Sequence, residues 1–223
     1  MIRIATLILA VLAATAALPA QAQLSKLRSL AGGGQSSAEA PAAAAPDEAA
    51  QEALVQRFVS SQSHSLRAQA SFAQAFGLAE QVQLLEAERL ALSSGSVNTD
   101  ALKKARSVSE NVQKALDERQ AEQPELSAEA RGHYTQGLLA LAESLLEARK
   151  LTGEASNFTA GMQGLGAMQM ATLGRKLVAG AWVAKESPGY VKGLYSSSKA
   201  ALTFARAAKI EVPASADSML DSL

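Results

Sequence analysis

The chain has no cysteine among its 223 residues. This absence excludes disulfide bonds, thiolate metal ligands and catalysis by a thiol. It also excludes attachment of a lipid to an N-terminal cysteine. Aromatic residues are scarce, at 4% of the chain, and β-branched residues never gather into the alternating runs that are typical of strands. The composition therefore favours an all-α fold.

An excess of charge of one sign is also missing, because 21 basic residues balance 21 acidic ones. We therefore expect no nucleic-acid partner. Long apolar runs are interrupted as well. The segment Ala155–Gly174 carries no charge and is long enough to span a bilayer, but polar side chains and four glycines lower its hydropathy, and Arg175 and Lys176 follow it. We expect no stable transmembrane anchor.

The N-terminus has the pattern of an export signal. Arg3 supplies a positive charge, Ile4–Leu18 supplies an apolar core, and Ala20-Gln21-Ala22 is a small-x-small cleavage site. The sequence therefore predicts a signal peptide over residues 1–22, with the mature chain beginning at Gln23. Its alanine-rich composition is typical of bacterial signals, which points to the periplasm or beyond.

The rest of the chain divides into three parts. Residues 23–46 are rich in Ala, Gly, Pro and Ser and predict a disordered linker, with one short basic amphipathic patch at Leu24–Leu30. Residues 47–212 have helical periodicity and short loops, which predict an up-and-down antiparallel bundle of five or six helices. Residues 213–223 predict a C-terminal tail.

Local signals predict where these helices begin and end. Asp47, either Asn98 or Thr99, and Ser127 are expected to lie at helix N-termini. Gly77 is expected to break or bend the first helix, and Gly153 to end the helix that begins at Ser127. Ser187-Pro188 is expected to start the last helix, because proline is favoured in a first helical turn.

A glycine- and methionine-rich stretch, Ala155–Lys185, is expected to form one buried helix on which the others pack. With about 100° of rotation per residue, its small residues share one stripe, which predicts close packing against another helix. These residues are Ala160, Gly164, Ala167, Ala171 and Gly174. A second surface of larger residues is expected either to pack or to line an apolar ligand site. It consists of Met162, Leu165, Met170, Leu173 and Trp182.

One short segment resembles an active site. Tyr195 to Leu202 resembles the Tyr-x-x-x-Lys segment of short-chain dehydrogenases, which implies a general acid at Tyr195 and a pKa-lowering lysine at Lys199. That family also has a glycine-rich turn between a strand and a helix to hold the cofactor pyrophosphate, and nothing like it precedes this segment. Residues four apart are neighbours on any helix, so we interpret the pair as helix neighbours.

The sequence contains no set of metal-ligating residues with a suitable spacing. Met168 and Met170 lie about 200° apart on a helix, so with Met162 they cannot converge on copper(I), and we interpret them as core filler. His64 and His133 stand alone, and Glu143 and Glu147 lack the Glu-x-x-His of di-iron bundles. Other carboxylates, Glu88 among them, are expected on solvent faces. We expect no catalytic residue, metal or cofactor.

These features lead to one main hypothesis. The chain is an exported, non-catalytic helical bundle that binds a partner protein or envelope component, and the number of subunits stays open. The alternative is a carrier or sensor of a small apolar ligand or lipid beside residues 155–185, and a helical enzyme is the least favoured interpretation. A cavity lined by Met162, Leu165, Met170, Leu173 and Trp182 would favour the carrier, whereas an exposed apolar groove would favour partner binding.

Overall fold

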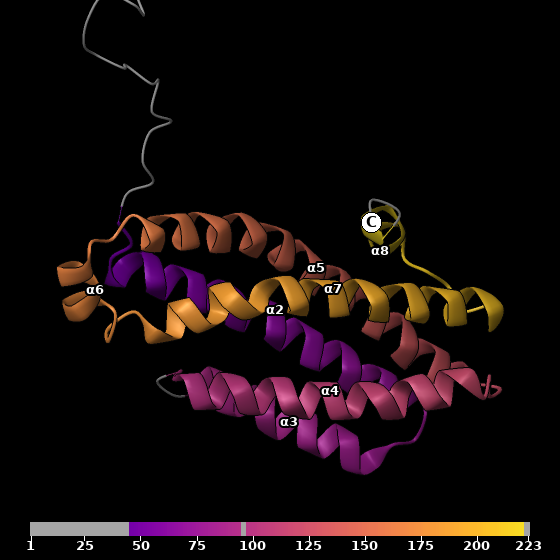
Figure 1. The fold of residues 1–223 in the computed structure, drawn as a ribbon. Helices are drawn as coiled ribbons and strands as arrows, with labels where there is room; N and C mark the ends of the chain where they lie inside the picture. The colour runs from indigo at the N-terminus through magenta and orange to yellow at the C-terminus, as the bar shows by residue number, and fades with distance from the viewer. Residues whose placement is uncertain (1–44, 95–96, 221–223) are drawn as a thin grey trace, which may run out of the picture. The chain divides into compact units, whose positions relative to one another are not determined.

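The structure, a computed structural model, describes residues 45–94 and 97–220. The expected signal peptide and nearly all of the expected linker lie outside these residues. Helices make up 84% of the described residues, which contain no strand, so the all-α prediction is confirmed. The seven helices are α2 (Glu48–Ala75), α3 (Ala79–Ser94), α4 (Thr99–Ala121), α5 (Ala128–Gln163), α6 (Ala167–Leu173), α7 (Val178–Ala207) and α8 (Ala214–Leu220) (Figure 1).

The predicted helix starts are confirmed by side-chain caps. The carboxylate of Asp47 accepts a hydrogen bond from the Ala50 N–H at 2.8 Å, and Asn98 accepts from the Ala101 N–H at 2.9 Å. The hydroxyl of Ser127 accepts from Ala130 N–H at 3.2 Å. Each cap satisfies backbone donors that the first helical turn leaves unpaired. Gly77, at φ 71°, separates α2 from α3, as predicted.

The predicted end at Gly153 is wrong, because α5 continues without a break to Gln163. Gly153 lies on the exposed side of the helix, while Leu151, Ala155 and Phe158 are buried on the other side. A helix-interior glycine costs about 1 kcal/mol relative to alanine. Burial of the larger residues on both sides of Gly153 outweighs that cost.

The expected single helix over residues 155–185 is also wrong. The stretch forms the end of α5, a turn at Gly164–Gly166, the short helix α6, a second turn and the start of α7. Three glycines between residues 161 and 166 weaken the helix where no large apolar side chain is fully buried to hold it. Within the described residues, no helix is both long enough and apolar enough to cross a membrane.

Helix α7 begins at Val178 rather than at Ser187, so Pro188 lies inside a helix. Val183, Ala184 and Ser187 are buried before the proline, and Tyr190 and Leu194 are buried after it. This continuous buried face carries the helix past the missing backbone donor of Pro188. The expected C-terminal tail also needs correction, since it contains helix α8, which packs on α5.

Helix α2 supplies the centre of the core and contacts α3, α4, α5 and α7 (Figure 1). The few aromatic residues gather in two clusters along it. In one cluster, the Phe58 ring lies 5.7 Å from that of Trp182 and 5.1 Å from that of Tyr190. In the other, Phe72, Phe76, Tyr134 and Phe204 pack together. These clusters join α2, α5 and α7 into one core.

Candidate functional site

Helix α6 connects α5 to α7 and has no buried residue (Figure 1). The side chain of Met168 is 84% exposed, and those of Met170 and the neighbouring Val178 are 43% and 51% exposed. The interpretation of Met168 and Met170 as core filler is therefore wrong. Neighbouring apolar side chains left in water are typical of an interaction surface, so α6 is the first element of the candidate site.

The turn after α6 is fixed to the start of α2. Lys176 Nζ donates to the Glu48 carboxylate at 2.7 Å, and this hydrogen bond raises the pKa of Lys176. The amide of Gln51 donates to the Lys176 carbonyl at 2.9 Å and accepts from the Gly180 N–H at 3.0 Å. Leu177 is fully buried. The turn after α6 is thus held firmly while the side chains of Met168 and Met170 remain exposed.

A groove of about 750 Å³ runs between the second half of α5 and the first half of α7. Small side chains form most of its walls: Ala155, Ser156, Thr159 and Ala160 from α5, and Ala184 and Ser187 from α7. Gln163, the last residue of α5, also lines it, so the groove extends to the turn that leads from α5 into α6. The groove and α6 therefore form one candidate surface.

The expected stripe of small residues does not pack against a neighbouring helix. Ala160, Gly164, Ala167 and Ala171 are exposed, and Gly174 is half-buried. A Cβ atom on Gly164 would meet only the Gly161 and Ala160 carbonyls, and one on Gly174 would meet the Met170 carbonyl at 2.5 Å. The stripe fails because the chain turns at Gly164, so helical periodicity no longer connects these residues. Ala160 alone joins the groove.

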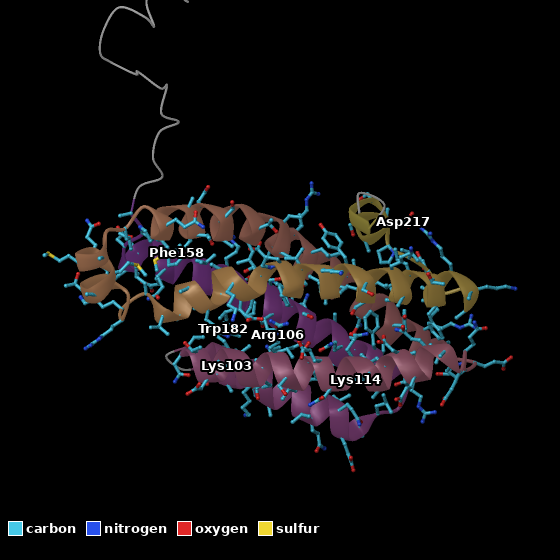
Figure 2. All side chains as sticks on the ribbon, viewed as in Figure 1. Lys103, Arg106, Lys114, Phe158, Trp182 and Asp217 are labelled. Atoms are coloured by element: carbon cyan, nitrogen blue, oxygen red, sulfur yellow. The ribbon has the colours of Figure 1, made fainter. Side chains whose placement is uncertain are left out.

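The larger residues of the stretch are not brought to one cavity either. Met162, Leu173 and Trp182 are half-buried against the core, Leu165 is half-buried, and Met170 is exposed. Trp182 packs edge-on against Phe58 and lines a pocket with Arg106 on the side of α7 that faces α4 (Figure 2). The sequence grouped residues that the fold distributes over different surfaces.

Two glycines that the sequence analysis overlooked make the close helix contacts. A Cβ atom on Gly137 would lie 2.5 Å from Cδ1 of Phe72, and one on Gly180 would lie 2.7 Å from Cζ of Phe158. Such distances leave no space for any side chain. The available signal was position, since Gly137 is three residues after buried Tyr134, and Gly180 is three residues after buried Leu177.

The residues that the sequence analysis considered for catalysis or metal binding lie in several separate places. Tyr195 lines the α5–α7 groove, whereas Lys199 lines a different pocket. Among residues 45–94 and 97–220, no three His, Asp or Glu side chains are placed to hold a metal ion. Glu147 binds Arg57 at 2.7 Å, and this hydrogen bond lowers the pKa of Glu147. Glu88 is buried against Lys104 at 2.9 Å, so its predicted solvent position is wrong.

Comparison with known proteins adds no assignment. The chain matches no family model, no curated protein and no solved structure. The function is therefore argued from the exposed helix α6, the α5–α7 groove and the side chains around them.

Proposed function

We propose that the chain is an exported, non-catalytic helical-bundle protein of the periplasm or beyond, and that it binds a partner protein through α6 and the α5–α7 groove. The observation that carries this proposal is the exposed methionine-bearing helix at the end of an open groove with small-residue walls. The export pattern of residues 1–22 supports the location.

The groove walls suit a helix or an extended segment of a partner. Alanine and serine side chains let another backbone approach closely, because they leave little side chain between the two main chains. Ala155, Ser156 and Ala160 supply this surface on α5, and Ala184 and Ser187 supply it on α7. A partner could fill the 750 Å³ with its own apolar side chains.

Helix α6 can increase the affinity for a partner and can accept partners of different shapes. Methionine side chains are unbranched and polarizable, so they adapt to differently shaped partners. Full burial of an exposed methionine is worth about 1.5–3 kcal/mol. Since Met168 is 84% exposed, contact with a partner would recover a large part of that free energy.

Charge near the groove suggests the chemistry of the partner. Arg175, Lys185 and Lys192 are exposed, and no ion pair within the described residues engages them. Between Glu154 and Glu186 the sequence contains no acidic residue. The partner surface is therefore expected to have an apolar centre with acidic residues at its edge.

The geometry supports partner binding better than carriage of a small apolar ligand beside residues 155–185. The carrier hypothesis needs Met162, Leu165, Met170, Leu173 and Trp182 around one cavity. Met170 points into solvent and Trp182 lines a pocket shared with α4. The open groove matches the observation that was expected to favour a partner.

Site-specific photo-crosslinking tests the proposal. A benzoylphenylalanine is placed at Ala160 in the groove, at Met168 on α6, or at Ala128 as an exposed control at the other end of α5. In the cells that produce the protein, the first two positions are expected to give one discrete adduct with another protein, and the third none. Mass spectrometry of the adduct separates a different protein from a second copy of this chain.

A second substitution makes the result specific to the groove. Ser156→Trp fills the groove from an exposed position and is expected to remove the adduct formed at Ala160. No adduct from Ala160, or the same adduct from Ala128, would contradict the proposal.

A further inference from the structure

The other side of α7 faces α4 across a polar crevice. A pocket of about 310 Å³ lies between the two helices, with α2 as its floor. It shares Arg106 and Glu110 with the pocket beside Trp182, and it shares Asp117, Gln120 and Ser197 with a third pocket toward the end of α7. The three pockets thus form one crevice between α4 and α7. Figure 2 labels Arg106 and Lys114 on α4 and Trp182 on α7.

Glycines on α7 keep this crevice open. Gly189 and Gly193 both line the 310 Å³ pocket, four residues apart on one face of the helix. A Cβ atom on Gly193 would have no atom within 4 Å, and one on Gly189 would meet only the guanidinium of Arg106 at 3.8 Å. A helix-interior glycine costs about 1 kcal/mol relative to alanine. No helix contact explains this cost here, whereas the space it leaves can hold a ligand.

Two buried amides point to what the space binds. Gln62 is fully buried on the floor of the pocket, and neither its Nε2 nor its Oε1 has a hydrogen-bond partner among the described residues. Gln120 is 9% exposed; its Nε2 donates to the Tyr134 hydroxyl at 3.0 Å, but its Oε1 is unpaired. An unpaired buried polar group is costly, so a hydrogen-bonding occupant of the pocket would stabilise these atoms.

A neighbouring glutamine shows that unpaired amides are not general in this crevice. Gln69 lies on the same face of α2 and donates to Gln113 Oε1 and to the Ser109 carbonyl, both at 3.0 Å. Its own Oε1 accepts from the Ser109 hydroxyl at 2.9 Å. The contacts with α4 thus satisfy Gln69 fully, whereas Gln62 has no partner among the described residues.

The remaining walls combine apolar side chains with charges of both signs. Phe72, Leu141 and Leu194 give apolar contacts, while Lys114 and Asp117 are exposed at the rim on α4. Lys114 has no ion pair within the described residues. A ligand that fits this set has an amide for Gln62, an apolar side chain, a carboxylate for Lys114 and an ammonium for Asp117.

We propose that the α4–α7 crevice binds a short peptide of two or three residues. Its amide group pairs with Gln62, its side chains lie against Phe72, Leu141 and Leu194, and its termini meet the charges of α4. This site is separate from the α5–α7 groove, since the two have no lining residue in common.

Isothermal titration of the full chain with the dipeptide Ala-Leu tests this proposal. We expect a saturable dissociation constant below 1 mM, on the scale where binding is about −4 kcal/mol. Gly193→Leu fills the crevice at a position where nothing is displaced, and it is expected to weaken binding at least tenfold. Gly153→Leu is the matched control, because Gly153 is also inside a helix with nothing within 4 Å but lies outside the crevice. It is expected to leave binding unchanged.

A second variant and two further ligands test which groups of the peptide the crevice recognises. Gln62→Met keeps the approximate volume, removes the amide and is expected to weaken Ala-Leu binding about tenfold. Free leucine, which lacks the peptide amide, and N-acetyl-Ala-Leu-amide, which lacks both terminal charges, are each expected to bind at least tenfold more weakly than Ala-Leu. Absence of Ala-Leu binding at millimolar concentration, equal affinity for leucine, or full binding by Gly193→Leu would each overturn the proposal.

Discussion

Helix α5 packs closely against α2 at Gly137 and against α7 at Gly180, whereas α7 faces α4 across a crevice near Gly193. Glycines thus occur both in a packed region and in an open one. In the packed region, Cβ atoms on Gly137 of α5 and Gly180 of α7 would collide with the rings of Phe72 and Phe158. In the open region, a Cβ atom on Gly193 would have no atom within 4 Å. The same residue type thus allows close helix contacts in the packed region and leaves space in the open one.

The side chains opposite each glycine account for this difference. Aromatic rings fill the packed region, because they bury a large apolar area and tolerate no gap. Helix α4 instead presents polar side chains that pair with α2, as Gln113 does with Gln69 at 3.0 Å, and with α7, as Arg106 does with Glu186. Those pairs hold α4 in place without filling the space beside Gly193.

Leucine substitutions at two glycines of α5 should give the largest difference. Gly137→Leu forces a side chain into the ring of Phe72 and is expected to lower the free energy of unfolding by about 3 kcal/mol. Gly153→Leu places the same side chain in open space and is expected to raise it by up to about 1 kcal/mol, because leucine favours the helix. Urea denaturation measures both. Similar effects at the two positions would mean that α2 and α5 are not in close contact.

The next largest effect is expected at alkaline pH, which should destabilise the packed region. Burial raises the pKa of the Tyr134 and Tyr190 phenols, and for Tyr190 the hydrogen bonds to Ser144, Ser61 and Ser65 offset part of this effect. Tyrosines in the unfolded chain ionise near pH 10, so the folded state retains protons that the unfolded state loses. The stability that these two phenols contribute is therefore present below pH 10 and is lost above it, by at most about 1.4 kcal/mol per pH unit for each tyrosine.

Unfolding by urea between pH 8 and pH 11 measures this slope. Tyr134→Phe and Tyr190→Phe should each reduce the slope above pH 10 by the contribution of one tyrosine. Leu138→Val weakens the same core but retains both phenols, so it should lower the whole curve without changing the slope above pH 10. An unchanged slope in both Phe variants would mean that water reaches these hydroxyls.

In the open region, removal of the unpaired amide of Gln62 should instead increase the stability of the protein. Gln62→Met eliminates two unpaired polar atoms and is expected to stabilise the ligand-free protein by about 1 kcal/mol. Gln69→Met breaks the bonds to Ser109 and Gln113 and is expected to destabilise it by a similar amount. Thermal unfolding of the two variants, without added peptide, gives the comparison. A loss of stability in both would show that Gln62 is already satisfied, for example by ordered water.

Much of the fold could be predicted because many of its boundaries depend on local chemistry. Asp47, Asn98 and Ser127 cap helices through bonds to backbone groups two or three residues away. Gly77 adopts a positive φ, which glycine tolerates better than other residues do. Such signals act within a few residues, so they can be recognised in one sequence.

Gly153, Pro188 and Gly164 show where local signals were not enough. Burial against α2 carries α5 past Gly153 and α7 past Pro188, whereas the chain turns at Gly164, where little is buried. Both candidate sites depend on this tertiary packing. Ala160 could be found in the sequence as a small residue, but its place in a groove follows only from the position of α7. The roles of Gly193 and Gln62 likewise depend on α4 lying opposite.

The smallest effect is expected on α6, where the sequence pattern had suggested close packing. Ala171 is exposed, and α6 has no buried residue, so Ala171→Leu should change the free energy of unfolding by less than about 0.5 kcal/mol. If Ala171 instead lay in the close helix contact that the sequence predicted, Ala171→Leu would lower the free energy of unfolding by about 1–3 kcal/mol through overpacking. Urea denaturation of Ala171→Leu and Gly137→Leu, measured side by side, separates the two cases, because it compares an added leucine side chain in open and in filled surroundings. A loss at Ala171 as large as that at Gly137 would place α6 against a neighbour and remove the exposed surface on which partner binding depends. A negligible loss, together with weaker crosslinking at Met168, would assign Ala171 to a surface used for binding and not for folding.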